Sequence, residues 1–192
     1  MKIEVRADGS VHIEGYVNAV GRDSRPIVTA EGRCVEMIEP GTFRKDLDRG
    51  KNVKLLLNHD TDKVYASTEE RSLKLTEDNI GLYAVLDTND PVIAKKAKNK
   101  EFRGWSFGMY VNKSYMETRE NNIPRRHVSG LTLVEVSLID MRKTPCYAGT
   151  SVECRAGEET VLEKRVAEIG DGDYSVKVPD YSSYENRIKN LN

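Results

Sequence analysis

Residues 133–139 read Leu-Val-Glu-Val-Ser-Leu-Ile, a stretch in which polar and apolar residues alternate. Alternation with a period of two is typical of a half-buried β-strand, so we predict a strand over residues 131–139. Glu135 and Ser137 would share one face, and the apolar members would share the other: Val134, Val136 and Leu138. A carboxylate flanked by valines is costly to bury without a partner, whereas on an edge strand its face would be wet. The pattern leaves both alternatives open.

Short strands continue outward from this stretch toward the N-terminus. The alternating or apolar runs that predict them are residues 3–5, 11–20, 33–38, 53–57, 63–65, 73–75, 80–86 and 105–111. Residues 115–126 are polar and are typical of an exposed connection between the last two strands.

Two short helices interrupt the strands. Thr42 is a suitable cap for a helix that runs to Asp48 and stops before Gly50. Asp90 and Pro91 are typical of a helix start, with Asp90 as the cap and a helix over residues 92–100. We therefore predict a fold that is mainly β with flanking helices, of the α+β class.

The composition limits the kind of protein. Of 192 residues 38% are hydrophobic, and 30 basic side chains nearly balance 31 acidic ones to give a net charge of −1. This balance argues against a globally basic nucleic-acid binder. No apolar run approaches the roughly 18 residues of a membrane span, and the N-terminus lacks the apolar core of a signal peptide. We expect no membrane partner.

We predict one domain over residues 1–155 and an appendage over residues 156–192. Residues 161–169 have an amphipathic pattern that predicts a helix, and the Gly-Asp-Gly-Asp run at residues 170–173 would end it. Residues 181–192 are polar and offer little to a core, so we expect a flexible tail.

Cysteine and histidine are scarce. The cysteines are Cys34, Cys146 and Cys154, an odd number with no Cys-x-x-Cys pair, which is typical of reduced thiols in a cytoplasm. No zinc motif is visible, and we expect neither a metal nor another cofactor. Any general-base histidine must be one of three: His12, His59 and His127.

Two further positions have features of a catalytic site. His59 directly follows a short apolar run, so a buried strand would hold its ring at a cleft, although a histidine that merely bonds a loop fits as well. Ser106 lies in Gly-Trp-Ser-Phe-Gly at residues 104–108, where glycine leaves room for close approach. The alternative is a strand with a bulge, in which Trp105 and Phe107 face one side and Ser106 the other.

The Gly-x-Ser-x-Gly match does not indicate the nucleophile elbow of an α/β-hydrolase. That elbow requires a helix after the serine, but residues 109–111 continue as a strand, and the chain lacks alternating strands and helices. Instead, His59, Ser106 and Glu135 each lie on or beside a predicted strand. A rigid sheet would be able to hold them as base, nucleophile and acid. Ser137 is the competing nucleophile.

Several motifs in this order resemble those of the phage prohead (capsid-maturation) serine proteases of the HK97 type, which are related to the herpesvirus assemblins. The resemblance covers roughly residues 15–150, with Cys146 where the family usually has alanine, and it rests on these segments: 36–43, 56–60, 81–82, 104–108, 133–137 and 144–150.

The resemblance implies a small assemblin-like β-barrel surrounded by helices. It implies a serine endopeptidase that cuts the scaffolding segment from the major capsid protein precursor, and usually itself, inside the assembling prohead in the host bacterial cytoplasm. His59, Ser106 and Glu135 match the family's catalytic positions, and Arg142 is a candidate to bind the oxyanion, with a solvent-facing arginine as the alternative. A homodimer is also implied. The alternatives are a non-catalytic β-barrel module that binds capsid or scaffold, and an esterase-type hydrolase.

Overall fold

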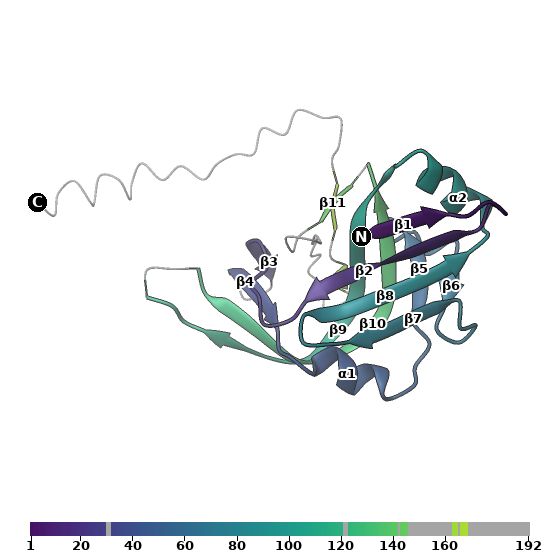
Figure 1. Cartoon of the computed structure of the whole chain (residues 1–192). Coiled ribbons are helices and arrows are strands. Elements are labelled where there is room, and N and C mark those ends of the chain that lie inside the picture. The colour runs from purple at the N-terminus through teal and green to yellow at the C-terminus, as the bar shows by residue number, and fades with distance from the viewer. Residues whose placement is uncertain (30–31, 121–122, 142, 146–162, 165, 169–192) are drawn as a thin grey trace, which may run out of the picture.

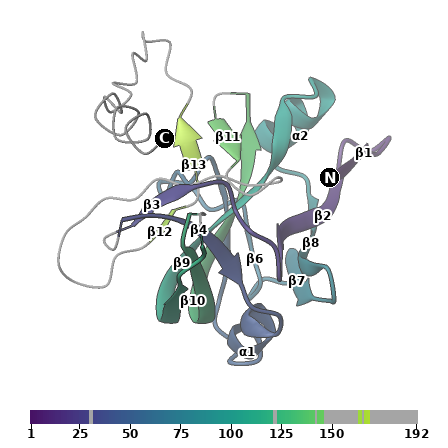
Figure 2. The ribbon, with the colours of Figure 1, turned by 90° about the vertical axis from the view of Figure 1, so that its left-hand side faces the viewer.

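The computed structural model describes residues 1–29, 32–120, 123–141, 143–145, 163–164 and 166–168, and the mainly-β fold is confirmed (Figure 1). The described part of the chain contains two helices, α1 (Thr42–Leu47) and α2 (Pro91–Lys98), which lie at opposite ends of the body (Figure 2). The strands are β1 (Lys2–Val5), β2 (Val11–Ala19), β3 (Ile27–Thr29), β4 (Gly32–Ile38), β5 (Lys54–Leu57), β6 (Ala66–Ser67), β7 (Leu73–Glu77), β8 (Gly81–Thr88), β9 (Phe102–Glu117), β10 (Arg125–Asp140), β11 (Lys143–Pro145), β12 (Glu163–Lys164) and β13 (Val166–Glu168).

The described strands form open sheets. One antiparallel sheet has the order β1-β2-β8-β7, a second has the order β12-β9-β10-β4-β3 with β5 and β6 attached to β10, and β11 pairs with β13. No closed barrel is found among these strands, because the edge strands β1, β7, β12 and β3 do not pair with one another. The closed barrel that the resemblance implies is therefore not found among the described strands.

Strand β10 organises the second sheet. Its whole length pairs antiparallel with β9, while its other edge pairs in parallel first with β4 and then with β5. Helix α1 fills the gap between β4 and β5, where the buried Asp46 carboxylate accepts the backbone N–H of Leu133 at 2.7 Å. This contact satisfies the Leu133 N–H, which lies in the part of β10 between the segments paired with β4 and β5.

The core lies between the two main sheets. Trp105, Phe107 and Met109 of β9 belong to one buried cluster with apolar side chains of β2 and β8. Phe107 also packs edge-on against Phe43 of α1, with ring centroids 5.5 Å apart. Each such buried side chain stabilises the fold by about 1.5–3 kcal/mol, so the apolar face of β9 is firmly held.

The two helices begin in different ways. Asp90 caps α2 as predicted, since its side chain accepts the backbone N–H groups of Val92 and Ile93. The expectation that Thr42 caps α1 is wrong: the capping position is Gly41, with φ of 83° and no side-chain bond. Instead, the Glu77 carboxylate of β7 accepts the N–H groups of Gly41 and Arg44. A residue distant in sequence therefore supplies the cap.

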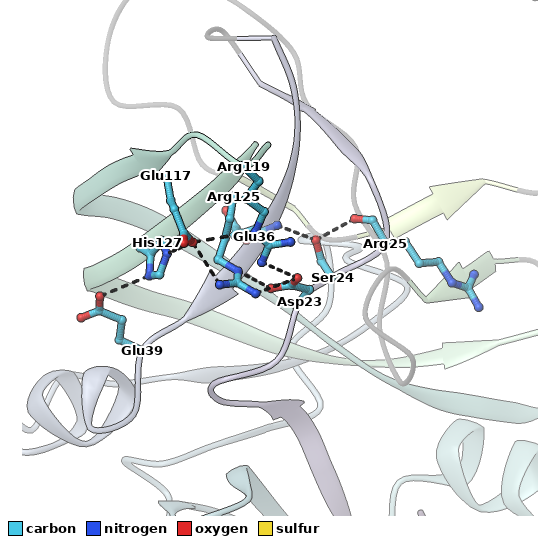
Figure 3. A network of polar contacts seen from close by, with 9 residues as sticks. All are labelled: Asp23, Ser24, Arg25, Glu36, Glu39, Glu117, Arg119, Arg125 and His127. Atoms are coloured by element: carbon cyan, nitrogen blue, oxygen red, sulfur yellow. Dashed lines mark hydrogen bonds and ion pairs between the residues drawn. The ribbon is translucent and has the colours of Figure 1, made fainter. Parts of the chain in front are cut away.

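The predicted exposed connection at residues 115–126 is too long, because β9 runs on to Glu117 and β10 already begins at Arg125, and the two strands form a projecting hairpin (Figure 1). Ion pairs hold the polar hairpin together (Figure 3). Arg125 donates to Asp23 at 2.6 Å and to Glu117 at 3.0 Å, and His127 Nε2 lies 2.8 Å from the same Glu117 carboxylate. Cross-strand pairs of this kind stabilise a strand whose sequence alone has no apolar alternation.

Two further expectations are wrong. The predicted helix at residues 161–169 is replaced by β12 and β13, because these short segments pair with β9 and β11. The predicted strand at residues 63–65 is displaced to β6 at Ala66–Ser67, where it pairs with β5.

A β-bulge in β10 changes the predicted face of Val134, whereas Glu135 and Ser137 lie opposite Val136 and Leu138 as predicted. Leu133 pairs with Met109, but the next aligned pair is Glu135 with Gly108, so Val134 is an extra residue. Val134 is only half-buried and lies outside the core cluster, which holds Leu131 and Leu133 before the bulge and Val136 and Leu138 after it. Strict alternation from Leu131 would have turned Glu135 into the core. The bulge turns it to the opposite face.

Candidate active site

A tight turn after β5 presents His59. Asn58 and His59 have positive φ angles of 54° and 61°, the requirement for both central residues of a type I′ turn. The Asp60 N–H donates to the Leu57 carbonyl at 3.0 Å and closes the turn. The left-handed region is unfavourable by about 1–2 kcal/mol for most residues, although asparagine and histidine are enriched there. The apolar β5 strand anchors this turn in the core.

Ser106 and Glu135 come from the two neighbouring strands of the second sheet. Ser106 of β9 is aligned with Ser137 of β10, and Ser137 is in turn aligned with Leu56 of β5. Glu135 lies two residues earlier in β10, on the same face as Ser137. The sheet therefore places β10, which carries the carboxylate, between β9, which carries the serine, and β5, which leads into His59.

The three side chains form a continuous polar chain. The His59 Nε2 atom lies 2.9 Å from Ser106 Oγ, and the His59 Nδ1 atom lies 2.5 Å from Glu135 Oε1. With a proton on Nδ1 donated to the carboxylate, Nε2 is left free to accept the serine hydroxyl proton. This is the arrangement of nucleophile, base and acid in a serine hydrolase.

Burial strengthens these contacts. Ser106 is 0%, His59 5% and Glu135 2% exposed, so the chain lies in a low-dielectric setting. Hydrogen bonds and ion pairs are stronger there than in water.

Comparison with known families identifies the family of the chain. A family model of caudovirus prohead serine proteases matches residues 1–164. The chain belongs to the caudovirus prohead serine protease family. Family membership supports a serine peptidase with a role in capsid maturation. No curated protein and no solved structure matches the chain.

The other residues singled out in this prohead protease chain lie elsewhere. His12 contacts Asp87 at 3.0 Å in the first sheet, and His127 belongs to the projecting hairpin, so neither joins the polar chain. Arg142, the candidate for the oxyanion, lies outside the described residues, as do Cys146 and Cys154.

Gly108 leaves space for the Glu135 carboxylate. A Cβ atom on Gly108 would lie 2.5 Å from Glu135 Oε1 and 3.2 Å from its Cγ and Cδ atoms. A side chain at this position would therefore displace the carboxylate. The glycines around Ser106 were expected to leave room for close approach. That Gly108 faces Glu135 depends on the register of β9 against β10, which has no signal in the local sequence.

The far side of the histidine turn is tied to α2. Asn58 Oδ1 accepts the backbone N–H of Asp140 at 3.1 Å, and the Asp140 carboxylate accepts Lys96 Nζ at 2.8 Å. Burial alone would lower the pKa of Lys96, but its hydrogen bonds to Asp140 and Glu101 hold that pKa above its usual value. Lys96 therefore stays charged around neutral pH, and its contact with Asp140 braces the end of β10 beside the turn.

In the described part of the chain, no group of three histidine, cysteine or acidic side chains is arranged to hold a metal ion. None of the helices in that part has the length and apolar character needed to cross a bilayer.

Proposed function

We propose that this chain is a serine endopeptidase that removes the scaffolding segment from a phage major capsid protein precursor, with Ser106 as nucleophile, His59 as general base and Glu135 as the orienting acid. The observation that carries the proposal is the unbroken contact chain from Ser106 Oγ through His59 to Glu135. Membership of the prohead protease family supplies the class of substrate.

In the proposed mechanism, each proton moves along the contacts between these three side chains. Ser106 Oγ attacks the scissile carbonyl carbon while its proton passes to His59 Nε2, at 2.9 Å. Glu135 stabilises the imidazolium that results and keeps the proton on Nδ1. When the tetrahedral intermediate collapses, the C–N bond breaks and Nε2 returns its proton to the leaving amine. Water then hydrolyses the acyl-enzyme by the same proton path in reverse.

Self-cleavage is part of the proposal. Strand β12 pairs antiparallel with β9, with Lys164 opposite Gly108 and Glu163 opposite Met109. Strand β12 is thus paired two residues from Ser106 along β9, which supports access of the protein's own backbone to the nucleophile.

We further propose a homodimer that acts inside the prohead with capsid and scaffold as its partners, without nucleic acid or a membrane.

Co-expression with the capsid precursor tests the proposed activity. We expect cuts between scaffold and capsid segments, mapped by mass spectrometry, that disappear in Ser106→Ala. A fluorophosphonate probe should label wild-type protein at Ser106. If the protein is neither labelled nor able to cleave the precursor, the non-catalytic capsid-binding module is favoured. Hydrolysis of a small ester without precursor cleavage would favour an esterase.

A further inference from the structure

Ser137 is a buried hydroxyl that the proposed mechanism leaves without a role. It is 0% exposed and lies on β10 between the strand of Ser106 and the strand that leads into His59. Ser137 is aligned with Ser106 of β9 on one side and with Leu56 of β5 on the other. The sequence pattern made it a competitor for the nucleophile.

The hydrogen bonds of Ser137 indicate a different role. Its Oγ donates to Glu135 Oε2 at 2.7 Å and accepts the backbone N–H of His59 at 3.1 Å. A serine hydroxyl has one proton to donate, and here that proton is directed at the carboxylate. The imidazole Nε2 atom contacts Ser106 instead, so the base faces Ser106 and not Ser137.

We propose that Ser137 is a positioning residue that locks the acid and the base of the catalytic chain together; this rests on the proposed function. Glu135 uses one oxygen for His59 Nδ1 and the other for Ser137. The two bonds fix the plane of the carboxylate, because rotation about its Cγ–Cδ bond would break both. A donated hydrogen bond also stabilises the ionised form of a buried carboxylate.

The second bond of Ser137 supports the backbone of the base. His59 has a φ of 61°, and its N–H is buried within the turn. By accepting this N–H, Ser137 satisfies a donor in a backbone conformation that costs free energy. One hydroxyl thus fixes the carboxylate from one side and the histidine backbone from the other.

The kinetic test is Ser137→Ala in the full chain, with cleavage of a precursor-derived peptide as the assay. We expect kcat to fall about 10–100-fold, since displacement of a supporting group by a fraction of an ångström has effects of this order. KM should stay within twofold, because the Ser137 hydroxyl is bonded to Glu135 and to the His59 backbone and acts on the reaction through them. Ser137→Thr retains the hydroxyl and should recover most of the lost kcat. Ser129→Ala is the matched control: it removes a hydroxyl of the same strand that has no hydrogen-bond partner among the described residues, and kcat should not change.

A spectroscopic test is independent of proteolysis. In Ser106→Ala protein with ¹⁵N-labelled histidine, the Nδ1 proton between His59 and Glu135 should give a far-downfield resonance, assigned by its loss in His59→Asn. We expect Ser137→Ala to shift or broaden this resonance and Ser129→Ala to leave it unchanged. If Ser137→Ala does not fold, Ser137→Cys, with a weaker donor of similar volume, is used in both tests and should show the same changes.

An unchanged resonance together with a kcat within twofold of wild type would overturn the positioning role. Fluorophosphonate labelling at Ser137 would overturn it as well, since the residue would then be the nucleophile. If wild-type protein cleaves no precursor, the proposed function fails, but the resonance still decides whether Ser137 orders the acid and the base.

Discussion

Gly108→Ala is the sharpest test of how the site is built. The added methyl group would lie 2.5 Å from Glu135 Oε1, whereas ordinary contacts begin near 3.4 Å, so the carboxylate must retreat by about 0.9 Å. The backbone of Glu135 cannot follow easily, because it is aligned with β9 on one side and β5 on the other. The movement therefore falls on the contact between Glu135 and His59.

A misplacement of about 1 Å costs on the order of 100-fold in rate, equal to about 2.7 kcal/mol of activation free energy. We expect Gly108→Ala to lower kcat by about this factor. Overpacking should also lower the free energy of unfolding by about 1–3 kcal/mol. The assay is the kcat for a precursor-derived peptide, with thermal unfolding measured in parallel to confirm that the variant is folded.

Gly130→Ala is the matched control in the same hairpin. A Cβ atom there would meet the Lys113 side chain at 3.1 Å, far along the strands from the catalytic chain. We expect kcat to be unchanged in this variant. A folded Gly108→Ala protein with wild-type kcat would refute the argument, since the carboxylate would then have no need of the space.

Four further predictions follow from the same structure. Ser106→Ala should abolish precursor cleavage and change the free energy of unfolding by less than about 1 kcal/mol, as checked by mass spectrometry and denaturant titration; residual cleavage would exclude it as the nucleophile. His59→Ala should be as inactive as Ser106→Ala, with the double variant no worse, because the base and the nucleophile act together; additive losses in kcat would show that the two do not act as a unit. Lys96→Met should lower the free energy of unfolding by about 2–3 kcal/mol, because Asp140 is 1% exposed and loses a charged partner; an unchanged urea midpoint would contradict this. A protein truncated after Gly170 should keep its activity, because β5, β9 and β10, which position His59, Ser106 and Glu135, all precede that residue. Loss of folding on truncation would show that the tail belongs to the core.

The helix starting at Asp90 and most strands before residue 90 were predictable from sequence, because caps and short alternating runs are local signals. The caps and ion pairs that come from distant residues were not. Glu77, which lies in the other sheet, caps the start of α1. The ion pair between Arg125 and Glu117 joins the two polar strands of the hairpin. Neither pairing leaves a signal in the local sequence.

By itself, the sequence determined a mainly-β chain and the candidates His59, Ser106 and Glu135, because each lies beside an apolar run that a sheet would hold. Only the tertiary structure decided how they meet. The bulge at Val134 places Glu135 on the face opposite Leu131 and Leu133, and the turn with positive φ angles brings the His59 ring into contact with Ser106 and Glu135. Register and backbone twist depend on pairing between segments far apart in the chain, and so the contact geometry of the site is a property of the assembled sheet.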